Sequence, residues 1–216
     1  VESEYLPRLD WQLLLDARTL HEFHGLLPPV EYKSELLPIL VELEGTRDMF
    51  SAEARLDSLY YRKLMGAARH LPRPTRSLGL ELVRWEVDLT NLITCLRNMA
   101  VYHFDEDELR GLLLPDGQEL DERQLLEIGS SDEIPAAVRK LPRQYRETLE
   151  PLAGRELYLS ETALWRGLYR RAEAAFKDFA RPALASVSYP FLRRFEFLNA
   201  GRLFEGLYLG LGPDTI

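Results

Sequence analysis

Apolar residues recur every three or four positions along most of the chain, which is typical of helices that bury one face. The pattern is clearest over residues 78–101, where the steps between apolar positions alternate between three and four. These positions, here called the heptad row, are Leu82, Trp85, Leu89, Leu92, Leu96 and Met99. The spacing predicts a long helix whose heptad row packs against other helices.

Prolines and glycines separate further segments with the same spacing, and both residues end helices. Longer helices are predicted over 10–27, 34–44, 51–70, 160–180 and 188–208, and shorter ones over 106–113, 121–128, 131–139 and 143–149. Asp10 is placed to cap the first helix, and Ser131 or Asp132 to cap the helix over 131–139. Pro72 and Pro74 are expected to lie in a break between helices, as is Pro182. We find no strand–turn–strand pattern, so the predicted fold class is all-α, a helical bundle.

Two blocks of the chain align without a gap at an offset of 108 positions, which indicates an internal repeat. The first block contains Tyr61, Arg62, Asp88 and Asn91, and the second contains Tyr169, Arg170, Glu196 and Asn199. The repeat predicts four parts. They are an N-terminal helical segment (1–50), a first helical unit (51–113), connecting short helices (114–159) and a second helical unit (160–216).

In each block the acid and the amide are three positions apart and therefore share one helix face. The Tyr and Arg precede them on a neighbouring helix. We interpret each set as a hydrogen-bonded cluster that fixes the register of two helices. Two alternatives stay open: the residues lie on a solvated surface, or the acids form a catalytic pair. Neither a second acid at a suitable place nor a nucleophile with its base accompanies either set.

Charge and motif content narrow the classes of function. The 216 residues include 27 Lys and Arg against 35 Asp and Glu, a net charge of −8. Nucleic-acid binders need Lys and Arg for phosphate contacts, so we expect no nucleic-acid partner. No run approaches the roughly 18 consecutive apolar residues of a membrane span. Because neither a P-loop nor a G-x-G-x-x-G motif occurs, we expect no ATP site, cofactor or small-molecule substrate.

The remaining chemical candidates are each weighed against a structural interpretation. The only cysteine, Cys95, excludes an intrachain disulfide, fits a reducing cytosol, and lies beside the heptad row, which favours a buried thiol over a nucleophile. His21 and His24 come one residue short of the H-E-x-x-H zinc motif, so surface histidines are favoured over a metal site. The arginine clusters at 166, 170, 171, 193 and 194 favour a solvated face or ion pairs within the bundle over nucleic-acid contacts.

Four stretches resemble the C/d subunit family of V-type and archaeal-type (A-type) rotary ATPases. Residues 56–64 (LDSLYYRKL) resemble its LD-x-x-YY-x-x-L helix, and residues 86–97 (EVDLTNLITCLR) its E-x-D-x-x-NL-x-T-x-x-R helix. Residues 113–120 (LLPDGQEL) are similar to an L-x-G-G-x-L turn in which Asp116 replaces one glycine. Residues 195–202 (FEFLNAGR) are similar to its E-x-x-N-x-R helix. The resemblance covers about 51–216, and residues 1–50 match poorly.

This resemblance implies a non-catalytic, funnel-like helical component of the central stalk. Its partners would be the rotor-ring proteolipid, on the cytoplasmic face of the membrane, and the central-shaft subunits. It would transmit torque that couples ATP hydrolysis or synthesis to proton or sodium transport, with no metal or cofactor of its own. Family members usually contain three such helical units, whereas this chain has room for two. The alternative is a free-standing helical adaptor with a soluble partner.

Overall fold

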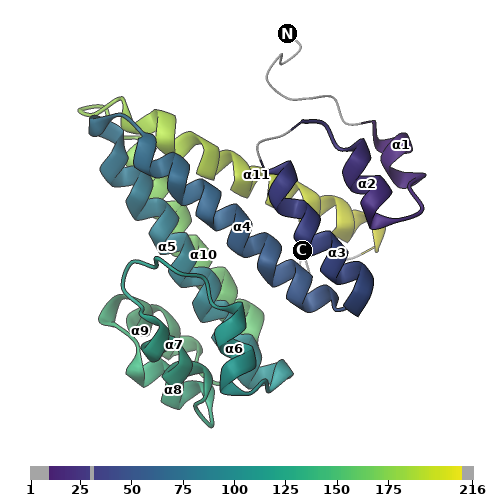
Figure 1. The fold of residues 1–216 in the computed structure, drawn as a ribbon. Coiled ribbons are helices and arrows are strands. Elements are labelled where there is room, and N and C mark those ends of the chain that lie inside the picture. Colours follow the sequence, from purple (N-terminus) through teal and green to yellow (C-terminus); the bar gives the residue numbers. More distant parts are fainter. Residues whose placement is uncertain (1–9, 30–31, 211–216) are drawn as a thin grey trace. The chain divides into compact units, whose positions relative to one another are not determined.

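The computed structural model describes residues 10–29 and 32–210, and every regular element within them is a helix (Figure 1). The predicted all-α class is therefore confirmed. The chain divides into two compact units, Val1–Lys63 and Leu64–Ile216, and the boundary falls inside helix α4. Of the predicted parts, residues 1–9, 30–31 and 211–216 lie outside the described residues.

The first unit contains α1 (Trp11–Leu15), α2 (Leu20–Leu26), α3 (Lys33–Thr46) and the beginning of α4 (Met49–His70). Its buried core consists of Ile39, Ala52 and Leu59, with Leu36 and Leu43 packed against them. Helices α3 and α4 are also joined by charge. The Glu35 carboxylate accepts from Arg62 at 2.6 Å and lies 2.5 Å from Lys63 Nζ. These two cations lower the pKa of Glu35, with Lys63 the larger cause.

The single helix predicted over 10–27 is wrong, because two capped helices replace it. The Asp10 carboxylate accepts from the Leu13 backbone N–H at 3.1 Å, as predicted for a cap. A second cap follows, in which Thr19 Oγ1 accepts from Glu22 N–H at 3.0 Å. Glu22 reaches back to the Arg18 N–H at 2.8 Å. These local bonds give the backbone an alternative to a continuous helix.

The second unit combines long helices with a group of short ones. The long helices are the end of α4, α5 (Arg73–Arg97), α10 (Leu157–Phe176) and α11 (Leu184–Tyr208). A π-helical turn, Asn98–Tyr102, extends α5. The short helices are α6 (Glu106–Leu112), α7 (Glu122–Gly129), α8 (Ile134–Lys140) and α9 (Arg143–Leu149), with a 3-10 turn at Glu150–Leu152. They gather at one end of the α5–α10 pair (Figure 1).

Four predicted helix boundaries need correction. Helix α5 begins at Arg73 because Pro72 is its N-cap and Pro74 lies in its first turn, where a missing backbone N–H costs no helical hydrogen bond. Neither Ser131 nor Asp132 caps α8, whose N-cap is Glu133 without a side-chain bond. Helix α10 ends at Phe176 rather than near residue 180. The break at Pro182 is found, but α11 begins at Leu184, before the predicted beginning at residue 188.

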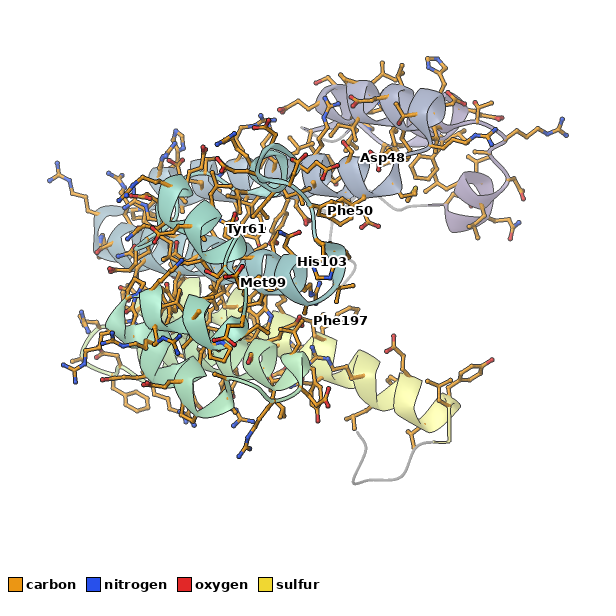
Figure 2. All side chains as sticks on the ribbon, turned by 90° about the horizontal axis from the view of Figure 1, so that it is seen from below. Asp48, Phe50, Tyr61, Met99, His103 and Phe197 are labelled. Atoms are coloured by element: carbon orange, nitrogen blue, oxygen red, sulfur yellow. The ribbon has the colours of Figure 1, made fainter. Side chains whose placement is uncertain are left out.

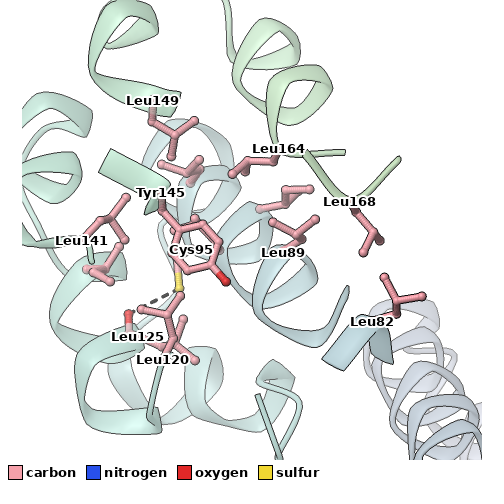
Figure 3. Close-up of a cluster of buried hydrophobic side chains, with 14 of the residues drawn as sticks. Leu82, Leu89, Cys95, Leu120, Leu125, Leu141, Tyr145, Leu149, Leu164 and Leu168 are labelled. Atoms are coloured by element: carbon pink, nitrogen blue, oxygen red, sulfur yellow. Dashed lines mark hydrogen bonds between the residues drawn. The ribbon is translucent and has the colours of Figure 1, made fainter. Parts of the chain in front are cut away.

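The predicted heptad row of α5 forms the centre of the core. Leu82, Leu89, Leu92 and Leu96 are at most 1% exposed, while Trp85 and Met99 are partly buried against them. Leucines of α10 and the short helices complete this core, as Figure 3 shows. Full burial of one such side chain is worth about 1.5–3 kcal/mol, so the heptad row supplies a large share of the unit's stability.

Candidate interaction site

The carboxylate of Asp88, in the middle of α5, is fully buried and anchors the loop that follows α6. Its Oδ1 accepts from the Gln118 N–H at 3.0 Å and its Oδ2 from the Glu119 N–H at 2.8 Å. The Tyr145 hydroxyl of α9 donates to Oδ2 at 2.8 Å. Burial raises the pKa of Asp88, although these three bonds act in the opposite direction. Burial and the nearby Asp88 charge also raise the pKa of Tyr145.

Asn91 anchors the same loop one turn further along α5. Its Nδ2 donates to the Leu114 carbonyl at 2.8 Å, and its Oδ1 accepts from the Leu114 N–H at 2.7 Å. Gly117 completes the fit, because a Cβ at that position would collide with Asp88 Oδ1. The acid and the amide lie on one face of α5, and they hydrogen-bond to a loop backbone and a tyrosine. These bonds fix the loop after α6 to the middle of α5. The cluster that joins them to Tyr61 and Arg62 stays a prediction.

The other residues of the first repeat block, Tyr61 and Arg62, belong to the first unit. Tyr61 is buried on α4 (Figure 2), and its ring packs edge-to-face with Tyr60 at 5.1 Å between centroids. Arg62 pairs with Glu35. The tyrosine on Asp88, Tyr145, was missed by the sequence interpretation. It lies 57 positions away on a short helix outside the repeat, and no spacing pattern links it to Asp88.

The second repeat block places its four residues along α10 and α11. The Tyr169 ring packs edge-to-face on Phe195 with 5.6 Å between centroids. Tyr169, Phe195 and Asn199 all line one surface groove. Glu196 is exposed and pairs with Arg193 of its own helix. Arg170 is exposed on α10. The equivalent acids of the two blocks therefore have different environments, since Asp88 is buried and the Glu196 side chain is 60% exposed.

The groove, here called the α5–α10–α11 groove, has a volume of about 380 Å³. Its apolar part is mainly aromatic, from Trp165, Tyr169, Phe191 and Phe195, with Leu168 and Leu198 beside them. Trp165 and Phe195 also meet edge-to-face, 6.4 Å between centroids. Volumes of this size are typical of sites that hold a small molecule or a few side chains of a partner.

Ion pairs connect the three helices around this groove. The buried Glu86 of α5 pairs with Arg194 of α11, whose guanidinium lies 6.0 Å from the Trp165 ring centroid. Arg97 donates two hydrogen bonds to Glu161 of α10, at 2.7 and 2.8 Å. A second bidentate pair joins Arg171 of α10 to Glu81 of α5, at 2.5 and 2.8 Å. Of the arginine clusters, Arg171 and Arg194 thus form the predicted ion pairs within the bundle, whereas Arg166 and Arg170 are exposed.

Two further arginines of the groove, Arg166 and Arg202, are exposed. Within residues 10–29 and 32–210, neither has a carboxylate at ion-pair distance. Each guanidinium presents five N–H donors in a planar fork that suits a carboxylate. The groove thus offers an aromatic wall beside two exposed arginines.

The remaining candidates have structural surroundings. Cys95 is buried, and its Sγ–H donates to the Leu125 carbonyl at 3.3 Å (Figure 3). The predicted buried thiol is thus confirmed. A ring nitrogen of His24 lies 2.7 Å from the Lys33 carbonyl oxygen. The described part of the chain contains no group of three or more metal-ligating side chains, and no helix there has both the length and the apolar character of a membrane span.

Comparison with known proteins identifies a family that the chain matches. The family model of the ATP synthase (C/AC39) subunit matches residues 1–216. The chain is similar to the C subunit of the A-type ATP synthase of Methanosarcina barkeri, with 29% identity over 188 residues, 85% of this chain and 51% of that one. The same-named protein of Thermococcus onnurineus is 24% identical over 219 residues, covering 98% and 56%.

A shorter match has a slightly higher sequence identity than these two. The C subunit of the A-type ATP synthase of Thermococcus kodakarensis is 30% identical over 125 residues, 58% of this chain and 32% of that one. The chain spans about half the length, or less, of these curated relatives. No solved structure matches the chain with significance.

Proposed function

Because the chain belongs to the ATP synthase (C/AC39) subunit family, we propose that it is a non-catalytic central-stalk component of a V/A-type rotary ATPase. It links the membrane rotor ring to the central shaft and transmits torque for ATP-coupled proton or sodium transport. It acts on the cytoplasmic face of the membrane, held there by the complex. The observation that carries this proposal is the family match over the whole chain.

The connections between helices support a torque-bearing role. A body that transmits torque must resist sliding of its helices past one another. Two bidentate arginine–carboxylate pairs join α5 to α10, and the buried pair of Glu86 and Arg194 joins α5 to α11. Bidentate pairs fix orientation as well as distance. The fully buried leucines between these helices add close packing, which has low compressibility.

We also propose that the two helix pairs are copies of one unit. Adding 108 to the bounds of α4 gives 157–178, and α10 covers Leu157–Phe176. The same shift of α5 gives 181–205, and α11 covers Leu184–Tyr208. Glu86 and Arg194, which contact each other, occupy equivalent positions at this offset. Tyr61, Arg62, Asp88 and Asn91 would then be the signature of the first copy, and Tyr169, Arg170, Glu196 and Asn199 that of the second.

The stalk role is tested by recovering the chain's partners. The tagged chain is purified from gently solubilised membranes of its own source, and bound proteins are identified by mass spectrometry. We expect the rotor-ring proteolipid and the central-shaft subunits. The control is an unrelated helical protein of similar net charge with the same tag, because a charge of −8 attracts basic proteins without specificity. Recovery of soluble partners alone, without any component of a rotary ATPase, would favour the helical adaptor instead.

A further inference from the structure

The charges of the α5–α10–α11 groove differ in sign from those of the chain. Four arginines and two glutamates line the groove, in a protein whose net charge is −8. Glu161 is held by Arg97, and Glu86 is held by Arg194. The two arginines that remain, Arg166 and Arg202, give the groove a net positive charge at its open side. Arginines without a carboxylate partner among the residues that the structure describes are, in an acidic protein, a local signal for an anionic ligand.

The groove also has an apolar surface that suits a ligand with apolar side chains. Its wall contains Trp165, Tyr169 and Phe195, and Leu198 of the wall is 43% exposed. The apolar surface continues along α11 beyond the groove, where Leu203, Phe204 and Leu207 are 53%, 73% and 69% exposed. Phe197, one residue before Leu198, is also 79% exposed (Figure 2). Apolar surface next to unpaired arginines is typical of protein–protein contact sites, where aromatic residues and arginine are enriched.

We propose that the α5–α10–α11 groove binds an acidic amphipathic helix of a partner protein. Apolar side chains of that helix pack on Trp165, Tyr169 and Phe195, and its carboxylates pair with Arg166 and Arg202. Binding an amphipathic helix in an apolar groove is a recurring mode of recognition. The inference goes beyond the proposed function, because it holds for the isolated chain whether or not the chain joins a rotary ATPase.

The net charge of the whole chain favours a protein helix over an anionic membrane or a nucleic acid as the ligand of the groove. An anionic membrane surface or a nucleic acid acts on the whole chain, which carries −8 and is repelled. A peptide helix contacts the groove alone, where the local charge is positive. Two unpaired arginines match two carboxylates on one helix face, whereas binding to a phosphate backbone rests on many such contacts.

The experiment compares two fluorescein-labelled peptides of about 16 residues, a length at which a helix can form on binding. Both peptides have leucine on one helix face. The first peptide has glutamate on the opposite face, and the second has lysine there. Their binding to the full 216-residue chain is measured by fluorescence anisotropy. The net charge of −8 predicts preference for the lysine peptide, and the groove predicts preference for the glutamate peptide. The two expectations therefore have opposite signs.

The double variant Arg166→Gln, Arg202→Gln identifies the site. We expect it to weaken binding of the glutamate peptide about tenfold or more and to reduce the dependence of affinity on salt. The matched control is Arg123→Gln, Arg155→Gln, which removes two exposed positive charges outside the groove and should change affinity less than about twofold. Circular dichroism of both variants checks that the helices are retained.

Four results would overturn the proposal. They are preference for the lysine peptide, no binding of the glutamate peptide, equal weakening by both double variants, and unchanged binding by the groove variant. Binding of the chain to phosphatidylserine vesicles that is lost in the groove variant, without peptide binding, would reassign the groove to a membrane surface. Because the peptide assay contains neither membranes nor other ATPase components, its failure leaves the stalk role to be judged by the purification above.

Discussion

Cys95 shows how burial controls the chemistry of a single residue. Its side chain is fully enclosed, Sγ–H donates to the Leu125 carbonyl at 3.3 Å, and the backbone of Gly129 packs close by. Burial raises the pKa of the thiol to about 12. Since only the thiolate is a nucleophile, about one molecule in ten thousand is reactive at pH 8 even before access is considered.

We therefore expect native Cys95 to be inert towards Ellman's reagent at about pH 8 and to react at once in denaturant. The release of the coloured thiolate is followed with and without guanidinium chloride. A Cys95→Ala variant is the control for background reaction. Fast stoichiometric reaction of the folded chain would show that the region between α5 and α7 opens readily, contrary to its close packing.

Asp88 predicts a pH dependence of stability with an unusual sign. Burial raises its pKa in the folded state, so over the range between the ordinary carboxyl pKa and the raised value the folded chain binds the proton more tightly than the unfolded one. Its contribution to stability then falls as pH rises through that range. Asp88→Asn cannot titrate, and it also replaces an acceptor with an N–H group beside a backbone donor, at a cost of about 1–3 kcal/mol.

The measurement is urea unfolding of the natural chain and its variants between about pH 2 and pH 7. We expect the advantage of the natural chain over Asp88→Asn to grow as pH falls. Asp178→Asn is the control of opposite sign. Arg181 lowers the pKa of Asp178, so the stability that Asp178 contributes is lost as pH falls through its lowered pKa, and the advantage over this variant should shrink. Parallel curves for the two variants would contradict the assignment of Asp88.

Part of this site was accessible from the sequence. The offset of 108 and the three-residue spacing identified Asp88 and Asn91 as a pair on one helix face, and the structure joins both to one loop. Their partners were not accessible. A backbone N–H carries no residue signal, and Tyr145 comes next to Asp88 only through the tertiary packing of α9, which contacts α8 and α10. Contacts made by tertiary folding leave no local pattern.

At the scale of the helices, we expect the contact between α5 and α11 to depend on Arg194. Arg194→Met removes the cation beside the buried Glu86 and the stacking on Trp165. Loss of one partner of a buried pair leaves an uncompensated charge, and because Arg194 itself is partly exposed we expect a loss of about 2–4 kcal/mol. The free energy of unfolding is measured by chemical denaturation.

The neighbouring residue supplies the control. Arg193→Met makes the same change in the same helix, but its partner Glu196 is 60% exposed. Exposed ion pairs contribute little, so we expect a change within about 1 kcal/mol. A double variant, Glu86→Leu with Arg194→Leu, should recover much of the loss, since apolar residues can replace a buried pair. Equal effects at 193 and 194 would contradict the role of the buried pair.

Helices were predictable wherever the apolar period extends over several turns. The heptad row of α5 was assigned from spacing alone and is the centre of the core. The prediction of helix boundaries failed where local hydrogen bonds or a proline interrupt a continuous apolar periodicity. The Thr19 cap divides residues 10–27 into two helices. Pro72 lies in the break between α4 and α5 as predicted, whereas Pro74 lies in the first turn of α5. A proline in the first turn and a proline in a break look alike in sequence.

At the scale of the whole molecule, the fold class follows from periodicity, whereas the groove does not. The period shows which residues of α5, α10 and α11 face a core. It does not show that Trp165, Arg166 and Arg202 line one hollow. That arrangement depends on how the helices cross, which side-chain shape and interhelical pairs such as Arg97 with Glu161 decide. The chemistry of a surface between helices therefore emerges only with tertiary structure.

The division into two compact units leads to a last prediction. The main core draws its buried residues from positions 78–187, all in the second unit. We expect a fragment covering 49–216, which keeps α4 whole, to fold with this core intact. Its Cys95 should stay as unreactive towards Ellman's reagent as in the full chain, because every buried neighbour of that thiol is retained.

A second fragment tests whether the core itself is what protects the thiol. A chain ending at residue 156 lacks α10 and α11, and with them Leu164, Leu168 and Ala172 of the core. Loss of several fully buried side chains removes more stabilisation than a domain of this size can spare. We expect Cys95 of this fragment to react quickly and its helical circular dichroism to fall. A reactive Cys95 in the 49–216 fragment would instead mean that the second unit requires residues 1–48 to fold.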